Sequence, residues 1–157
     1  MNPKEKVAMN IITNKRLVTG WLGASLLALM LSACEFEVST SGIGGVSASR
    51  EKNGGPQSTT FDVMDKIYVT AVTKSVSKGT KIKWRTYTMK VDGQTENSPI
   101  TNFDNTTELP GSGTADYNLT PPANGWPSGI YKIEATMLLE GGKQQDQKSI
   151  EITVKAS

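Results

Sequence analysis

Apolar and polar residues alternate in several segments from residue 61 onward, and this period of two limits the possible folds of the chain more than any other feature. Residues 81–85 read Lys-Ile-Lys-Trp-Arg, which places Ile82 and Trp84 on one face of a strand and three cations on the other. A half-buried strand shows this alternation, whereas a helix repeats its apolar residues about every 3.6 positions. The same pattern occurs in residues 67–72, 114–120, 131–139 and 150–154. We therefore expect an all-β domain, a sandwich or barrel of five to seven short strands.

Glycine pairs predict where the chain turns. Residues 140–143 read Glu-Gly-Gly-Lys and lie between the last two alternating segments. Paired glycines supply the positive φ angles that a tight hairpin turn needs. We therefore expect residues 131–139 and 150–154 to belong to two strands that this turn joins.

The first residues combine positive charge with a short apolar run. The apolar segment covers residues 21–31, which is shorter than the roughly 20 apolar residues that span a bilayer. A basic stretch followed by such a segment is typical of a secretory signal peptide, which is removed on export. The sequence leaves Met1 and Met9 open as the start of translation. The basic residues that precede the run are Lys4, Lys6, Lys15 and Arg16.

The end of the apolar run, Leu31-Ser32-Ala33-Cys34, resembles the lipobox of bacterial lipoproteins. The resemblance implies that residues 1–33 are a signal peptide, that Cys34 carries a lipid with chains such as palmitate, and that this lipid anchors the protein in the bacterial cell envelope. Glu35 is not the aspartate that the resemblance associates with inner-membrane retention, so the outer membrane is favoured, with its periplasmic or surface side left open. The alternative is that Cys34 is a buried thiol after an ordinary signal peptide.

The composition changes over residues 34–59, where glycine and serine dominate and no period of two or 3.6 persists. Such a segment buries too little apolar surface to offset the entropy that ordering costs. We therefore expect residues 34–59 to hold the lipidated cysteine and a flexible tether with a reach of roughly 25 to 30 Å. Residues 60–157 are then the folded domain, which holds no disulfide because the chain has a single cysteine.

Removal of the leader changes the charge of the protein. The whole chain carries 17 basic and 15 acidic residues, of which residues 34–157 retain 13 and 14. The basic character therefore belongs to the leader and gives no argument for binding nucleic acid. The sequence contains no histidine, which removes Ser-His-Asp catalysis and imidazole zinc sites. We expect no cofactor, no metal ion and no enzymatic activity.

Two aromatic positions resemble those of immunoglobulin-like domains. Trp84 lies in the middle of one expected strand, and Tyr131 begins another, after Trp126-Pro127-Ser128-Gly129-Ile130. Immunoglobulin-like domains have a core tryptophan on strand C and a tyrosine near the start of strand F whose hydroxyl bonds to nearby backbone. The resemblance covers residues 61–154 and implies an immunoglobulin-like β-sandwich of about seven strands in which Trp84, Trp126 and Tyr131 are structural. It places Ile133 where antibody domains have a disulfide cysteine.

A stripe of cations is the best sequence indication of a binding surface. Lys81, Lys83 and Arg85 project from the face of their strand opposite Trp84. This stripe, which we call the β-strand stripe, suits acidic glycans, lipopolysaccharide phosphates or an acidic protein surface. The alternative is a solvated outer face whose cations pair with neighbouring acids.

Patterns that indicate catalysis or metal binding are weaker. Residues 75–78 read Ser-Val-Ser-Lys, as in the Ser-x-x-Lys motif of penicillin-binding enzymes, but we expect them in a turn rather than on the helix that those enzymes use. Asp104 and Glu108 flank a polar loop that could hold Ca²⁺, although their spacing matches no known ligand pattern.

Three functions follow, in order of preference. The first is a membrane-anchored envelope lipoprotein whose β-sandwich is a non-catalytic binding or interaction module for an envelope protein or polysaccharide. The second is a structural accessory subunit of a surface, secretion or adhesion assembly. The third is a small hydrolase, which the missing histidine disfavours.

Overall fold

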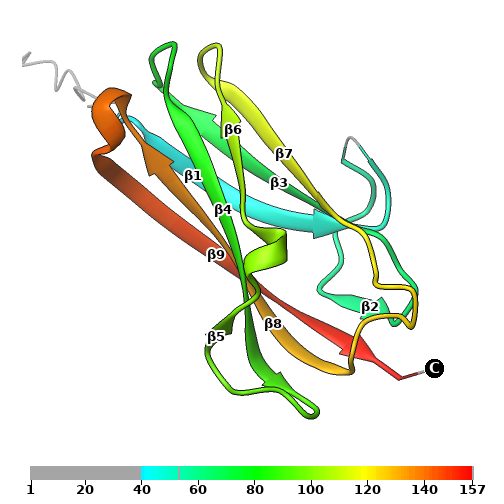
Figure 1. Cartoon of the computed structure of the whole chain (residues 1–157). Helices are drawn as coiled ribbons and strands as arrows, with labels where there is room; N and C mark the ends of the chain where they lie inside the picture. Colours follow the sequence, from blue (N-terminus) through cyan, green and yellow to red (C-terminus); the bar gives the residue numbers. More distant parts are fainter. Residues whose placement is uncertain (1–39, 53, 157) are drawn as a thin grey trace, which may run out of the picture. The chain divides into compact units, whose positions relative to one another are not determined.

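The computed structural model describes residues 40–52 and 54–156. This part of the chain is all-β, as predicted, with two short 3-10 helices (Figure 1). The predicted signal peptide (residues 1–33) and Cys34 lie outside the described residues. No helix in the described residues is long and apolar enough to cross a membrane. The elements are β1 (Gly42–Ser49), β2 (Thr60–Asp62), β3 (Ile67–Lys74), β4 (Lys81–Val91), β5 (Ser98–Pro99), η1 (Thr101–Phe103), β6 (Asn105–Glu108), β7 (Gly113–Leu119), β8 (Gly129–Leu138), η2 (Glu140–Gly142) and β9 (Gln144–Lys155).

The strands form two sheets that pack against each other. The smaller sheet has the order β1-β3-β7, and the larger has the order β2-β9-β8-β4-β5, with β6 also paired to β4. All pairs of named strands are antiparallel except β2 with β9. The rings of Trp84 on β4 and Tyr117 on β7 stack across the two sheets with their centroids 5.3 Å apart. The two sheets therefore share one apolar core, and each sheet contributes buried side chains to it.

The alternating segments predicted five of the six long strands of the described residues correctly, namely β3, β4, β7, β8 and β9. On β4, Ile82 and Trp84 are fully buried while Lys81 and Lys83 reach solvent, which is the alternation that the sequence indicated. The predicted hairpin turn is also confirmed: Gly141 and Gly142 both have a φ near +80°, at 83° and 82°. The described residues contain nine strands, so the predicted count of about seven is not confirmed.

Strand β1 corrects the predicted tether. Residues 42–49 pair antiparallel with β3, so the expectation that residues 34–59 form a flexible tether is wrong for this stretch. Ile43 and Ala48 are both buried although they are five positions apart, because a bulge between Ile43 and Gly45 shifts the register by one residue. A bulge reverses which face later side chains occupy, and this removes the period of two from the sequence.

The turns gather at two ends of the domain. The end that we call the η2 end holds η2, the turn between β3 and β4, and the start of β1. Figure 1 shows β1 in cyan beginning beside η2 in orange, while β9, in red, ends at the opposite end. Thr40 and Gly42 share a surface hollow with Lys74 and Lys148, which places the first described residues at the η2 end.

Candidate binding site

The β-strand stripe lies on the outer face of β4, where two of its three cations have an acidic neighbour. Nζ of Lys81 lies 3.9 Å from a carboxylate oxygen of Glu108 on β6, and Nε of Arg85 lies 3.7 Å from one of Asp104. Lys83 makes no ion pair within the described residues. Exposed pairs of this kind add little stability, but they do neutralise charge. The arrangement therefore favours the alternative of a solvated outer face with paired charges.

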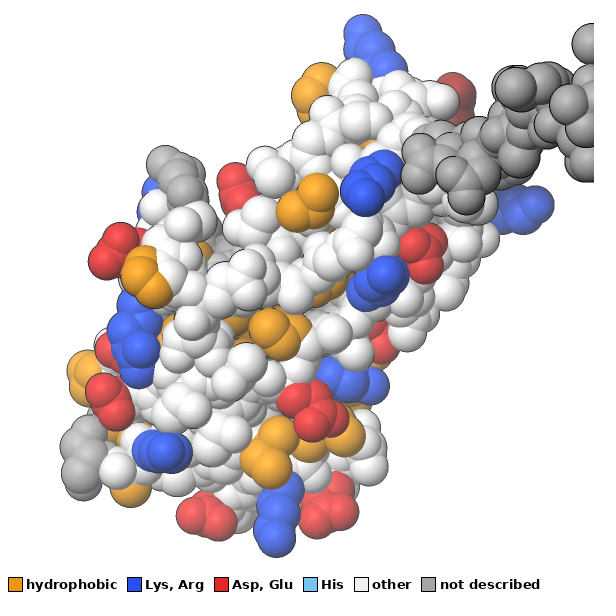
Figure 2. Space-filling model, turned by 180° about the vertical axis from the view of Figure 1, so that it is seen from behind, with side chains coloured by type: hydrophobic (Ala, Val, Ile, Leu, Met, Phe, Trp, Pro, Cys, Tyr) orange, Lys and Arg blue, Asp and Glu red, His pale blue; other side chains and the backbone are white. Residues whose placement is uncertain are grey.

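The next row on the same face is also balanced in charge. Lys132 on β8 lies opposite Tyr87, with its Nζ 4.6 Å from the centroid of the tyrosine ring. The same Nζ lies 3.8 Å from a carboxylate oxygen of Glu134. Figure 2 shows the back of the molecule, where acidic and basic side chains are likewise interspersed. With two of its three cations paired, the stripe lacks the uncompensated charge that binding a polyanion requires.

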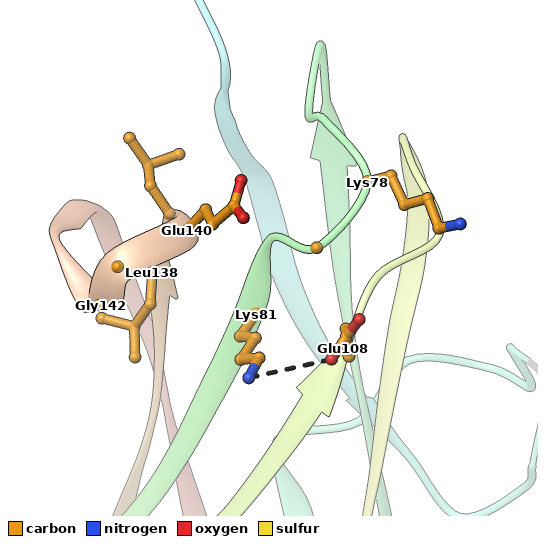
Figure 3. Close-up of a pocket in the computed structure, with 9 residues that line it drawn as sticks. Lys78, Lys81, Glu108, Leu138, Glu140 and Gly142 are labelled. Carbon is orange, nitrogen blue, oxygen red and sulfur yellow. Dashed lines mark ion pairs between the residues drawn. The ribbon is translucent and has the colours of Figure 1, made fainter.

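A hollow of about 400 Å³ opens at the η2 end, where the stripe begins (Figure 3). Its charged lining residues are two lysines and two glutamates, and Lys81 faces Glu108 across the ion pair drawn there. The remaining walls come from the turn between β3 and β4 and from η2. The hollow suits a small polar ligand that carries both donors and acceptors. Its lining is Lys78, Gly79, Lys81, Glu108, Leu138, Leu139, Glu140, Gly141 and Gly142.

A second hollow of about 270 Å³ lies on the outer face of the smaller sheet. Ser47, Thr70 and Asp116 stand in one row across β1, β3 and β7. The hydroxyl of Thr70 donates a 2.9 Å hydrogen bond to the Asp116 carboxylate, and the side chain of Gln57 adds an amide. A lining of hydroxyl, amide and carboxylate groups suits a neutral polyhydroxyl ligand.

The weaker catalytic and metal patterns gain no geometric support. Residues 75–78 form part of the turn between β3 and β4, so no helix brings Ser75 and Lys78 onto one face. Asp104 and Glu108 face Arg85 and Lys81 instead of a shared cavity. Within the described residues no three potential ligands lie close enough to hold a metal ion.

The three predicted structural aromatics are all buried and all make hydrogen bonds. The indole nitrogen of Trp84 donates to the hydroxyl of Thr107 at 3.3 Å, and that of Trp126 donates to the carbonyl of Asp65 at 2.9 Å. The hydroxyl of Tyr131 donates to the carbonyl of Pro127 at 2.7 Å. A buried aromatic ring with a satisfied polar atom adds apolar contact without a desolvation penalty.

Asp65 lies at the other end of the domain, where it organises the approach to β3. Its carboxylate accepts a 2.9 Å hydrogen bond from the backbone N–H of Asp62 and a 2.8 Å bond from Nε of Arg50. These contacts, the backbone bond first, lower the pKa of Asp65 below its usual value. The carboxylate therefore ties Arg50 to the turn that precedes β3.

Two buried tyrosines predict a loss of stability at alkaline pH. Burial raises the pKa of Tyr117 and of Tyr131 to about 12. The unfolded pKa is about 10, so each group contributes stability that is complete below pH 10 and is lost as the pH rises toward 12. We expect the free energy of unfolding in urea to fall over this range, and to fall less steeply for the Y117F/Y131F variant. Equal pH dependence in that variant and in the control Y68F/Y87F, whose two tyrosines are only half-buried, would contradict the prediction.

Sequence reasoning missed how the charged residues are grouped. The run of cations from Lys74 to Lys90 reads as one basic segment, yet the structure spreads it over the end of β3, the turn that follows and the length of β4. The first hollow is lined in part by Glu140 and by Glu108 of β6. Strand β6 has only four residues, which is too short for a period of two to be recognised in the sequence, and Glu140 lies in a turn. Only the antiparallel register of β4 with β6 brings Glu108 beside Lys81.

Comparisons with known proteins give weak likenesses. No protein-family model matches the chain, and no curated protein matches its sequence. A family 76 glycoside hydrolase from a bovine Bacteroides thetaiotaomicron strain is 16% identical over 71% of this chain, with a TM-score of 0.44, and the match spans only 20% of the hydrolase. The PmoD soluble domain from Methylocystis sp. is 12% identical, with a TM-score of 0.43, over 70% of this chain and 89% of its own. A Niemann-Pick type C2 protein from Japanese carpenter ant is 11% identical, with a TM-score of 0.43, over 74% and 95%. These values carry no argument about function.

Proposed function

We propose that the chain is a lipid-anchored protein of the bacterial cell envelope whose β domain is a non-catalytic binding or interaction module. The sequence Leu31-Ser32-Ala33-Cys34, followed by a compact all-β domain, is the observation that carries the proposal. The open hollows of the described surface, whose linings carry charged, hydroxyl and amide groups, support binding, since their walls do not exclude water from a reacting group. The outer membrane is the favoured address, because Glu35 follows the cysteine.

We further propose that the two sheets form an immunoglobulin-like sandwich. The orders β1-β3-β7 and β9-β8-β4 correspond to A-B-E and G-F-C of that architecture. Trp84 lies on the strand that corresponds to C, and Tyr131 lies near the start of the one that corresponds to F. The bond from Tyr131 to Pro127 supports a tyrosine corner. Ile133, Val69 and Ala71 are fully buried, which agrees with aliphatic packing in place of the disulfide.

The anchor is tested by replacing Cys34. In the C34S variant, expressed with its leader, we expect nearly all of the protein to leave the membrane fraction, since no acyl chains remain to bury methylenes worth about 0.8 kcal/mol each. Fractionation followed by mass spectrometry of the N-terminal peptide checks this, because a diacylated peptide is heavier than a free thiol. An S32A variant, which keeps a small residue in the lipobox, serves as the matched control. Unmodified Cys34 in the membrane-extracted protein would exclude lipidation.

The first and second proposed functions, a binding module and a subunit of an assembly, predict different partners for the protein. A pull-down from detergent-solubilised envelopes is expected to yield weak protein or polysaccharide ligands for the first and one stoichiometric complex for the second. A hydrolase would instead show turnover that a single substitution abolishes without unfolding the domain.

A further inference from the structure

Strand β1 shortens the distance between a lipid on Cys34 and the folded domain. Thr40, the first described residue, follows Cys34 by six positions and already lies against the η2 end. Six fully extended residues reach at most about 20 Å, and a flexible chain of that length averages roughly 13 Å. The lipid would therefore hold the η2 end within one or two Debye lengths of the membrane surface.

The η2 end is the positively charged end of the domain. Its lysines outnumber its acids by five to three among the described residues, and four of the five make no ion pair within that part of the chain. Lys81 is the exception, because it pairs with Glu108. The Asp146 carboxylate lines the same hollow as Lys74 and Lys148 and accepts a 2.7 Å hydrogen bond from the backbone N–H of Ile43. The unpaired lysines are Lys74, Lys78, Lys143 and Lys148, all of which are exposed.

The opposite end gives the comparison. It carries five basic and five acidic residues, and Arg50 there is paired with Asp65 at 2.8 Å. This end has no excess charge, whereas the end nearest to the anchor has an excess of positive charge. Lysines near an anionic lipid surface are attracted to it, and this attraction decays within a Debye length. The short segment that joins Cys34 to the domain and the excess of lysines are therefore both at the η2 end.

We propose that the domain docks on the anionic phospholipid headgroups of the membrane that holds its anchor, through Lys74, Lys78, Lys143 and Lys148. The inference rests on the proposed function, because it takes Cys34 as the point of attachment. The domain then stands with its η2 end on the lipid and its C-terminal end directed away. The 400 Å³ hollow beside η2 faces the headgroups, and the hollow on the smaller sheet remains open to other ligands.

The test uses purified residues 34–157 and attaches the lipid chemically, so that it does not depend on lipidation in the cell. Cys34 is the only cysteine, so a maleimide phospholipid attaches at that thiol alone. The conjugate is placed on vesicles of phosphatidylcholine with 30% phosphatidylglycerol, or of phosphatidylcholine only. Lysine acetylation is then read by mass spectrometry. We expect acetylation of the four η2-end lysines to slow about threefold or more on the anionic vesicles, with Lys52, Lys66, Lys90 and Lys155 at the other end unchanged.

Two charge-reversal variants complete the design. In K78E/K143E, Lys74 and Lys148 remain as reporters, and we expect their protection to be lost. In the matched control K90E/K155E, at the other end, protection is retained. Two results would overturn the docking proposal. One is that, on anionic vesicles, the lysines of the η2 end are acetylated as fast as those of the other end. The other is that the η2-end lysines are protected as strongly on phosphatidylcholine vesicles as on anionic ones. Lipidation in the cell is scored separately from the mass of the N-terminal peptide, so its failure is distinguishable from a failure of docking.

Discussion

Replacing Trp84 by alanine is expected to lower the free energy of unfolding by about 4 kcal/mol. The side chain is fully buried on β4, and its ring stacks on Tyr117 with a centroid separation of 5.3 Å. Alanine would leave a cavity between the two sheets, because strands fixed by their hydrogen-bond ladders cannot collapse to fill it. It would also remove the donor to the hydroxyl of Thr107.

Urea denaturation of residues 34–157 measures this change. Because the predicted loss approaches the whole stability of a typical domain, W84F provides a milder variant that keeps an aromatic ring and should lose less. The matched control is K83A, the neighbouring residue on the outer face, which we expect to stay within about 0.5 kcal/mol of the unmodified domain. A W84A midpoint as high as that of K83A would show that Trp84 is not part of the core.

Replacing Gly129 by alanine is expected to cost about 3 kcal/mol or more, from strain and overpacking together. Gly129 begins β8 with a φ of +146°, a conformation that residues with a side chain rarely adopt. An added Cβ would lie 2.2 Å from the carbonyl oxygen of Lys90 and 2.6 Å from the Cα of Val91. Both contacts are with backbone, so relief requires β4 and β8 to separate at the bulge near Thr88 and Lys90.

Gly111 offers a matched control for this substitution. An added Cβ there meets no atom within 4 Å, and its φ is not positive. We expect G111A to change the urea midpoint slightly in either direction and G129A to lower it strongly. Similar urea midpoints for the two variants would contradict the prediction, because they would show that β4 and β8 can separate at Gly129 without a large loss of stability.

The alternation of residues decided which long segments became strands. On β4 and β8, apolar residues at every second position bury one face, and a one-residue slip would expose all of them. The period therefore identifies both the strand and its inner face. The paired glycines of η2 predicted the hairpin for an equally local reason, because they supply positive φ angles without steric cost.

Strand β1 was missed because its stability comes from elsewhere in the chain. Its glycines and serines bury little surface, but β3 offers a free edge with which the backbone of β1 forms a ladder. Asp146, 103 positions after Ile43, also caps the backbone N–H of that residue. No local window of sequence contains these partners, so composition alone predicted a flexible tether.

For the β-strand stripe, too, the sequence predicted one part and the tertiary structure decided the other. The order of residues on β4 established that Lys81, Lys83 and Arg85 share an outer face. Whether they remained an uncompensated stripe depended on β6 and on the residue after η1, which place Glu108 and Asp104 beside two of them. Charge pairs between strands follow from register, and register is a tertiary property.

The sequence by itself determined the all-β class, the inward faces of β3, β4, β7, β8 and β9, and the hairpin at η2, because these depend on side-chain alternation and local backbone freedom. The tertiary structure alone decided that residues 42–49 join the smaller sheet, which cations are neutralised, and which lysines gather at the η2 end. These outcomes depend on contacts between residues far apart in the chain, where pairing of backbones and charges outweighs the preferences of any single segment.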